Sequence, residues 1–314
     1  MRIVSLLPSA TEILFALGLE REVVGVSHEC DFPAQARNKR VVIHSRLPHD
    51  APPAEIDRLV REYVARGESL YAVDALTLEE LAPDLIVTQD LCQVCAASPD
   101  DLAAALARFA EPPEVLTLNP QDLSDVWRDV LWVGEATRRG FQAEALLEEI
   151  GSRLGELERH VAAVQERPRV AVLEWLQPFY VGGHWVPEMI ELAGGRDVLG
   201  HKCTPSFRVT IEEVMDASPD VLLIAQCGYD AKRARDEYVA MTFPEEWNDV
   251  PAVRTGRVYA VDASSYFSRP GPRLVTGIEA LAKLLHPAVE VSAEAECAVL
   301  PIGTQTPAAR VASA

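Results

Sequence analysis

Short runs of β-branched residues alternate with stretches of helical periodicity along most of the chain, and this alternation limits the fold more than any other feature. The first half holds five such runs, at residues 2–7, 23–26, 41–43, 84–88 and 114–118, and helices are predicted to begin near Ser9, Pro53, Pro99 and Gln121. After Pro168 the alternation restarts with RVAVLEW, FYVGG, VLLIA and RVYAVD. Such alternation is typical of α/β folds with mostly parallel sheets.

One long helical stretch separates the two halves. Residues 143–165 carry apolar side chains at helical spacing and contain no proline. We therefore predict two α/β lobes, over residues 1–140 and 168–287, joined by a connecting helix over 141–167. A length of 314 residues suits two domains. The alanine-rich tail over 288–314 has no sustained pattern and is expected to be disordered.

The apolar opening of the chain has some features of a signal peptide. Ser9 and Glu12, however, have the spacing of a capping box, and Gly18 is placed to end the helix that follows. We interpret the opening as strand, turn and helix, and so expect a cytoplasmic location. A periplasmic or cell-surface location would follow if a leader has been removed. In the cytoplasm the six cysteines would be mainly thiols.

The charge balance limits the partners. The chain has 48 acidic and 29 basic residues, a formal net charge of -19, which repels phosphate backbones and argues against nucleic acid. No uninterrupted apolar run reaches the length of about 18 residues that predicts a membrane span. A small-molecule ligand is the remaining expectation.

Aromatic, charged and thiol side chains gather directly after the predicted strands, where open parallel sheets bind ligands. Two lobes with such edges predict a cleft for a large, flat, partly polar molecule. Aromatic rings would form its walls and Arg269 and Arg273 would donate hydrogen bonds. Burial in the core is an equally weighted alternative for any single ring. The candidate ligand contacts are Trp175, Phe179, Trp185, Tyr266, Phe267, Arg269, His28 and Glu29.

Four cysteines follow three of the predicted strands, with Cys92 and Cys95 after the same one. Cys30, Cys92, Cys95 and Cys227 are compatible with a thiolate metal site, with a Cys92–Cys95 redox pair, or with structural thiols, and the sequence leaves the three open. The chain lacks GxGxxG after a strand, GxxxxGK[ST] and GxSxG. Dinucleotide binding, P-loop hydrolysis and α/β-hydrolase chemistry are therefore not predicted, and no catalytic residue is assigned.

Several segments together resemble a known family over residues 1–287. They are RIVSLLPSATEILFALG, LAPDLIVTQ, the long helix, VGGHWVPEMIELAGG, TIEEVMDASPDVLLIA and RVYAVDASSYFSRPGPRLVTGIEALAKLL. The family is that of the substrate-binding proteins of iron-siderophore and vitamin B12 ABC importers, and within it the cobalamin-binding proteins. The resemblance implies two lobes with the ligand between them and a docking acid on each lobe. Glu212 matches the second acid, while Glu79 and Glu80 lie only near the first.

The leading interpretation is a non-catalytic, transport-related binding protein for cobalamin or a related corrinoid or metal chelate, with an ABC permease as partner. One alternative is a cytoplasmic metal- or thiol-dependent enzyme that uses the Cys30, Cys92, Cys95 and Cys227 set on the same scaffold. A second alternative is an iron-siderophore binding protein, which would need a more basic cleft.

Overall fold

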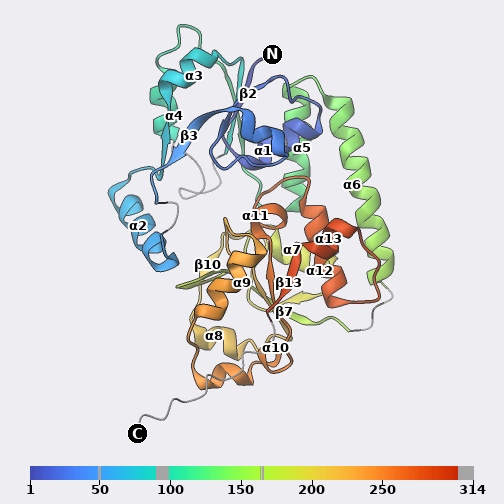
Figure 1. Ribbon diagram of the computed structural model, residues 1–314. Coiled ribbons are helices and arrows are strands. Elements are labelled where there is room, and N and C mark those ends of the chain that lie inside the picture. Colours follow the sequence, from blue (N-terminus) through green and yellow to red (C-terminus); the bar gives the residue numbers. More distant parts are fainter. Residues whose placement is uncertain (49–50, 90–98, 163, 165, 303–314) are drawn as a thin grey trace. The chain divides into compact units, whose positions relative to one another are not determined.

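The computed structural model describes residues 1–48, 51–89, 99–162, 164 and 166–302, and these form two compact units (Figure 1). Unit 1 contains residues 1–155 and also 269–275, and unit 2 contains residues 156–268 and those from 276 onward. The predicted lobe boundaries did not include the return of residues 269–275 to unit 1. That return depends on ion pairs between residues far apart in the sequence.

Unit 1 is built on a sheet whose described strands run in the order β4-β3-β2-β1-β5-β6. All neighbouring pairs are parallel except β3 and β4. Ile3 and Val4 are both fully buried but belong to different hydrophobic clusters, so both faces of the central strand are covered. The strands are β1 (Ile3–Ser5), β2 (Val23–Ser27), β3 (Arg40–Ser45), β4 (Tyr71–Val73), β5 (Leu85–Gln89) and β6 (Glu114–Leu118).

The helices of unit 1 follow the strands in alternation, as the sequence predicts. The long helix α6 begins in unit 1 and ends in unit 2. The helices are α1 (Pro8–Ala16), η1 (Ala34–Asn38), α2 (Pro53–Arg66), α3 (Ala75–Leu81), α4 (Pro99–Leu106), α5 (Leu123–Ala136) and α6 (Gly140–Val161).

The predicted capping box at the start of α1 is wrong. The helix begins at Pro8, its N-cap residue Leu7 makes no side-chain cap, and Glu12 binds Arg273 instead. Proline at the first helical position needs no capping partner for its missing N–H group. Gly18 adopts a φ of 75° directly after the helix, as its predicted role as a stop requires.

Unit 2 has a mixed sheet with the described strand order β10-β8-β7-β11-β12-β13, and β9 also pairs with β7. The strands β7, β11 and β12 are parallel, whereas β8, β10 and β13 pair antiparallel with their neighbours. The strands are β7 (Arg169–Leu176), β8 (Phe179–Val181), β9 (Arg196–Asp197), β10 (Phe207–Arg208), β11 (Val221–Ile224), β12 (Val258–Val261) and β13 (Val299–Pro301).

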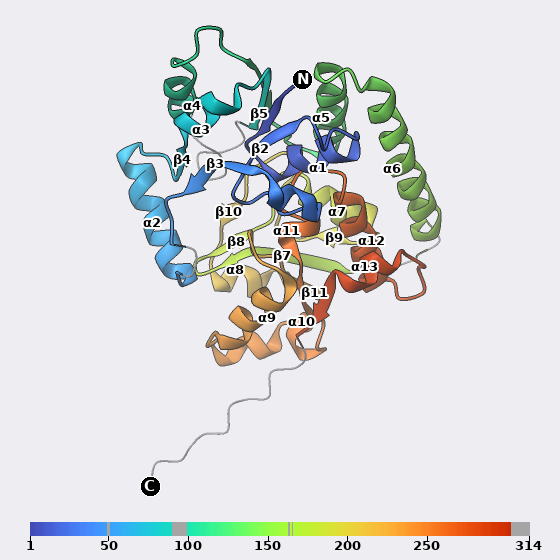
Figure 2. The ribbon, with the colours of Figure 1, turned by 45° about the horizontal axis from the view of Figure 1, so that its top comes forward.

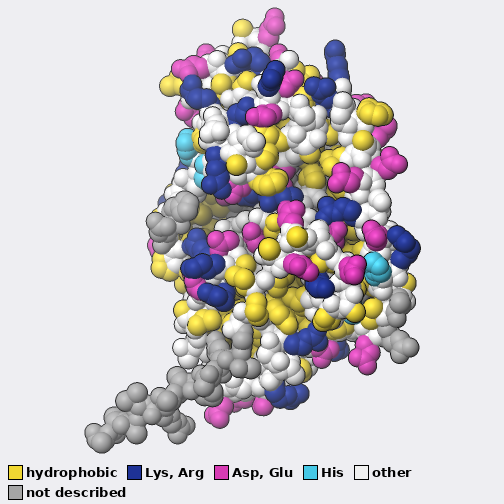
Figure 3. Space-filling model, turned by 45° about the vertical axis from the view of Figure 1, so that its right-hand side comes forward, with side chains coloured by type: hydrophobic (Ala, Val, Ile, Leu, Met, Phe, Trp, Pro, Cys, Tyr) yellow, Lys and Arg dark blue, Asp and Glu magenta, His cyan; other side chains and the backbone are white. Residues whose placement is uncertain are grey.

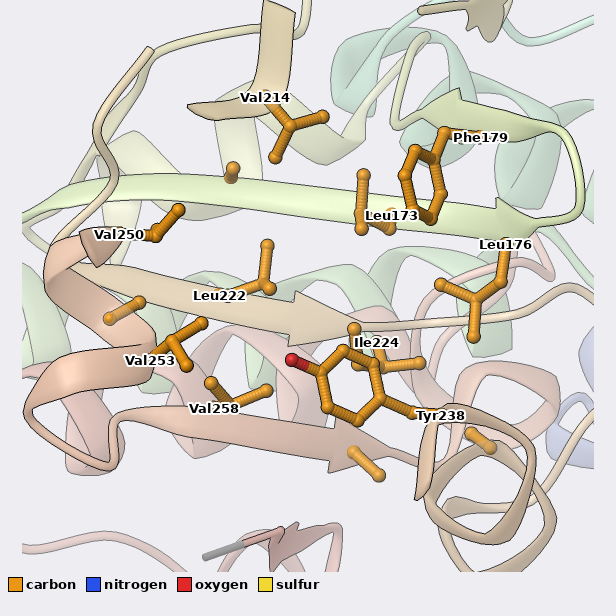
Figure 4. Packing of buried hydrophobic residues seen from close by; sticks show 14 of the residues in the cluster. Leu173, Leu176, Phe179, Val214, Leu222, Ile224, Tyr238, Val250, Val253 and Val258 are labelled. Carbon is orange, nitrogen blue, oxygen red and sulfur yellow. The ribbon is translucent and has the colours of Figure 1, made fainter. Parts of the chain in front are cut away.

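Figure 4 shows the packed core on one face of this sheet, where Leu173 lies beside Phe179 and Ile224 lies beside Tyr238. Alternate residues of β7 and β11 contribute to it, as expected for strands covered by helices. The helices of unit 2 are α7 (Val186–Leu192), α8 (Ile211–Asp216), α9 (Ala231–Ala240), η2 (Glu245–Asp249), α10 (Pro251–Arg254), α11 (Ala263–Tyr266), α12 (Leu274–Leu285) and α13 (Ala293–Cys297).

The segment after Pro287 differs from the expectation of disorder as far as residue 302. Ala293–Cys297 form α13, with Ser292 as its cap, and β13 pairs with β12. Ala295 and Ala298 pack on Ala280 of α12, and Figures 1 and 2 show α12 and α13 side by side. Small alanine side chains permit this close packing, which a search for regular apolar periodicity does not detect. Residues 303–314 lie outside the described part.

The predicted fold class, two α/β lobes with mostly parallel sheets joined by a long helix, is confirmed. In the described part of the chain, no helix combines the length and the hydropathy needed to cross a bilayer.

Candidate ligand-binding site

Three parallel strands bring separate loops to the carboxyl edge of the unit 2 sheet. Ala225 N–H donates to Leu173 O at 2.9 Å, and Cys227 N–H donates to Glu174 O at 3.2 Å, so the residues after β11 lie against the end of β7. Ser264 N–H donates to Tyr229 O at 3.3 Å, which joins the loop after β12 to the same edge. In open α/β sheets this edge is where ligands bind.

An aromatic pair lies at this edge. The half-buried ring of Trp175 is 5.7 Å from the ring of Tyr229. The Arg233 guanidinium stacks 3.8 Å from the Tyr229 ring centroid and donates to Tyr229 Oη at 3.2 Å. Trp175 was among the predicted contacts. Tyr229 and Arg233 were not, because only the fold shows that the loop between β11 and α9 lies against the end of β7.

Two partly buried carboxyl groups lie beside the end of β7. Glu174 accepts hydrogen bonds from the Ser206 hydroxyl and the Gly183 N–H group. Burial raises the pKa of Glu174 to about 7, and the nearby Asp197 carboxylate raises it as well. Burial also raises the pKa of Asp197, although Leu199 and Gly200 N–H groups donate to its Oδ1. Burial therefore disfavours the ionised form of both carboxyl groups.

Three predicted ligand contacts belong to the core of unit 2. The Phe179 ring stacks 6.1 Å from Trp247, in the cluster drawn in Figure 4. Trp185 is 4% exposed and its Nε1 donates to Phe267 O at 2.8 Å, while Phe267 itself is 1% exposed. For these rings the structure favours the alternative of burial in the core.

Tyr266 packs against α13 rather than standing free at the edge. Its hydroxyl donates to Glu294 Oε1 at 3.1 Å, and its ring contacts the cluster of Ala280 and Ala295. The expectation of a disordered tail hid this partner, since Glu294 lies in that tail.

His28 and Glu29 follow β2 at the carboxyl edge of the unit 1 sheet. His28 Nδ1 lies 3.1 Å from Ile43 O, its ring lies 6.0 Å from that of Tyr71, and its Nε2 lies 3.9 Å from Glu29 Oε1. Backbone contact with β3 thus fixes the imidazole, while the Glu29 side chain is about half exposed.

Both predicted arginines are held by acids within unit 1. Arg273 makes a bidentate pair with Glu12, with Nη2–Oε1 and Nε–Oε2 distances of 2.6 and 2.9 Å. Arg269 Nη1 lies 2.5 Å from Asp31 Oδ1 and 3.6 Å from Glu12 Oε1. Arg273 also stacks 3.9 Å from the Phe32 ring centroid. Both guanidinium charges are therefore compensated by the protein itself.

The sequence analysis missed Glu12 as the centre of this network. The side chain is 3% exposed, and burial is the main influence, raising the pKa of Glu12, while hydrogen bonding to Arg273 opposes that rise. An acid inside an apolar run was the available signal, but its partner lies 261 positions away.

The cysteine set receives no support as a metal site. Cys30 is buried and accepts a hydrogen bond from Thr11 Oγ1 at 3.1 Å, and burial raises the pKa of its thiol to about 11. Cys227 is an exposed thiol in unit 2, and Cys92 and Cys95 lie outside the described residues. Within the described part, no group of three His, Cys, Asp or Glu side chains is arranged to hold a metal ion.

The predicted docking acids differ in their surroundings. Glu212 is exposed in the first turn of α8, where a capping box of Thr210 and Glu213 fixes the helix start. Glu79 instead pairs with Arg108 at 2.8 Å, and Glu80 pairs with Arg40 at 3.1 Å.

A surface hollow of about 510 Å³ lies at the opposite, amino-terminal edge of the unit 2 sheet. None of the predicted contacts lines it. Its lining residues include Arg167, Arg169, Asp220, Thr255 and Arg257.

The family model described as periplasmic binding protein matches residues 3–264. An uncharacterized ABC transporter substrate-binding lipoprotein of Bacillus subtilis is 25% identical over 91% of this chain and 80% of its own length. A vitamin B12-binding protein of Vibrio parahaemolyticus is 24% identical over 88% and 86%. The structure of a periplasmic heme-binding protein of Pseudomonas aeruginosa has a TM-score of 0.71 and 21% identity, covering 93% of this chain and 95% of that one.

These findings correct the expected location. The cytoplasmic prediction is wrong, because the matching proteins are periplasmic or are lipoproteins. The apolar opening forms β1 and α1 of unit 1, so the burial of these two elements explains its apolar residues. With the family model matching most of its length, this chain belongs to the periplasmic binding protein family.

Proposed function

We propose that this chain is the substrate-binding protein of an ABC importer and that its substrate is a corrinoid of the cobalamin type. Family membership and the names of the relatives support the first part. Vitamin B12-binding proteins among the relatives support the second, while the similarity to a heme-binding structure is a likeness of fold alone. The choice between the ligands therefore depends on the chemistry of the predicted contacts.

The observation that carries the choice is the state of Arg269 and Arg273. Heme presents propionate carboxylates, which arginine recognises well, whereas the corrin ring of cobalamin presents uncharged carboxamides. Both guanidinium groups are already paired with Glu12 and Asp31. Recruiting Arg273 to a propionate would leave the carboxylate of Glu12, which is 3% exposed, without its bidentate partner, which is costly. The unit 1 edge thus suits a ligand that needs no cation.

The overall charge points the same way. The formal net charge is -19, and on the face shown in Figure 3 acidic and basic side chains are interspersed. A field of that sign disfavours anionic chelates, including the iron-siderophore of the second alternative. An uncharged amide-bearing ring avoids this penalty.

On unit 2, the half-buried Trp175 is the proposed aromatic wall, and Tyr229, which is 3% exposed, packs against it from the core. On unit 1, His28 and Glu29 are proposed polar contacts. Phe179, Trp185 and Phe267 are buried in unit 2. A flat ring gains much of its binding free energy from stacking on such side chains.

For the importer itself, we propose that Glu212 contacts a basic pocket of the permease. The side chain is exposed in the first turn of a capped helix, so the backbone that carries it is fixed and its carboxylate is accessible. Glu79 and Glu80 fit this role less well, because each is engaged with an arginine. A Glu212→Lys variant should bind ligand normally and fail to support uptake by its transporter.

An absorbance titration with hydroxocobalamin tests the proposed ligand. Saturation at one equivalent, with a dissociation constant in the micromolar range or below, is the expected result. The Trp175→Ala variant should bind more weakly under the same conditions. Saturation by hemin with no response to hydroxocobalamin would overturn the corrinoid assignment.

A further inference from the structure

Gln226 is the most unusual polar side chain at the carboxyl edge of unit 2. It is 0% exposed, and neither its Nε2 nor its Oε1 has a hydrogen-bond partner in the described structure. Buried amide groups are almost always paired, because leaving one unpaired forfeits the hydrogen bonds that it made to water. A donor and an acceptor are therefore held ready at this position.

The backbone around Gln226 is fixed by the sheet. Ala225 and Cys227 donate to the strand β7 on either side of it, at 2.9 and 3.2 Å. Tyr229 N–H donates to Gln226 O at 3.0 Å, and Gly228 at a φ of 81° permits this tight turn. The unpaired amide is thus attached to a rigid part of the site, and a shift of the backbone does not relieve it.

The surroundings place this amide beside the proposed aromatic wall. The next residue, Cys227, is exposed at the same edge of the sheet. Tyr229, at the other end of the turn, packs against Trp175 of the aromatic wall.

The chemistry of the amide selects its partner. A primary carboxamide on the ligand can accept from Nε2 and donate to Oε1 at the same time, which satisfies both atoms. A carboxylate can only accept, so it would leave Oε1 unpaired and facing a negative charge. We propose that Gln226 is a specificity-determining residue that recognises a carboxamide group of the ligand. This inference rests on the proposed function and narrows it to amide-bearing rings.

A competing explanation is that Gln226 is a structural orphan or is paired with a buried water molecule. The two explanations differ in how stability and affinity respond to removal of the amide. Gln226→Leu removes the unpaired amide and the free-energy cost of burying it. The melting temperature should therefore stay equal or rise under either explanation. Only recognition of the ligand predicts that affinity falls while stability does not.

The test measures affinity by isothermal titration and the melting temperature for wild type, Gln226→Leu and Gln226→Met. The ligands are hydroxocobalamin and derivatives in which one side-chain carboxamide is hydrolysed to the acid. Wild type should prefer the intact ligand by at least tenfold over one of the acids, and both variants should lose this preference and at least tenfold in affinity. Gln142→Leu, which removes an exposed amide from α6, should change neither quantity.

The outcomes separate the inference from the proposed function. Unchanged affinity and preference in Gln226→Met, with wild type binding the corrinoid, overturn carboxamide recognition and leave the proposed function standing. Binding of hemin in place of hydroxocobalamin by the wild type overturns both. If Gln226→Leu does not fold, the near-isosteric Met variant decides between them.

Discussion

The carboxyl edges of the two sheets differ in how their buried polar groups are paired. At the unit 1 edge, Arg269, Arg273, Glu12 and Asp31 neutralise one another. At the unit 2 edge, Gln226 has no partner in the described part of the chain. A self-satisfied network offers a ligand little, whereas unpaired groups gain hydrogen bonds when a ligand arrives. The contrast assigns a structural role to the charges of unit 1 and a recognition role to the uncharged groups of unit 2.

The largest expected effect comes from breaking the unit 1 network. Glu12→Ala leaves two arginine side chains, each at most 15% exposed, without their shared partner. The free energy of unfolding should fall by about 3–5 kcal/mol, since an uncompensated buried charge remains. Urea unfolding followed by circular dichroism measures this change.

The matched control is Glu80→Ala, which removes an acid from the exposed pair with Arg40. Exposed pairs contribute about 0–1 kcal/mol, so this variant should unfold nearly as wild type does. Equal losses in both variants would contradict the view that burial gives the Glu12 network its importance.

The aromatic wall of unit 2 gives the next effect. Trp175→Ala removes a ring that packs on Tyr229, and corrinoid affinity should fall by about tenfold or more, in line with the loss of stacking and buried area. Absorbance titration measures it. Trp132→Ala, on an exposed face of α5 in unit 1, is the control and should bind as wild type. If corrinoid affinity falls in Trp132→Ala and not in Trp175→Ala, the assignment of the wall is wrong.

The ionisation of two acids, Glu174 in unit 2 and Asp129 in unit 1, makes the stability of the protein depend on pH. Burial raises the pKa of Glu174 in unit 2 to about 7, and raises the pKa of Asp129 in unit 1 to about 7 as well. A carboxyl group with a raised folded-state pKa favours folding when protonated. Its contribution is therefore most favourable below the unfolded value of about 4.5 for Glu, decreases as pH rises toward about 7, and is constant above.

Glu174→Gln should accordingly reduce the loss of stability between pH 5 and pH 8, by up to about 3 kcal/mol. Denaturant unfolding at the two pH values measures this. Glu148→Gln on the exposed surface of α6 should keep the pH dependence of the wild type. A Glu174→Gln profile that parallels the wild type would show that Glu174 stays ionised when folded.

The smallest effect concerns Tyr266. Removing its hydroxyl in Tyr266→Phe breaks the bond to Glu294 and should cost about 0.5–1.5 kcal/mol of stability. Corrinoid affinity should not change, because the ring packs on α13. A loss of affinity without a loss of stability would restore Tyr266 as a ligand contact.

Local patterns in the sequence were sufficient for most of the fold. β-branched runs and helical spacing predicted the parallel strands and α6, because each element is encoded by its own residues. The tail was mispredicted because α13 is short and packs through alanines, and β13 depends on pairing with β12.

The candidate site depended more on long-range contacts. Trp175 was predicted as a contact because it follows a strand, and it stays a prediction. Arg269 and Asp31 are 238 positions apart, and no local pattern reveals that they pair. Gln226 was passed over for the same reason, since an unpaired amide is recognised only when all of its neighbours are known. Phe179 and Phe267 were assigned to the wall because sequence position alone does not distinguish a core ring from a cleft ring.

The most direct test of the central claim is a competition titration in which the wild-type protein receives equal concentrations of hydroxocobalamin and hemin. With the arginines of unit 1 already paired and the amide of Gln226 unpaired, the corrinoid should occupy the protein and hemin should not displace it. Preferential occupation by hemin would contradict the account, because it would require a cation that the paired arginines do not supply.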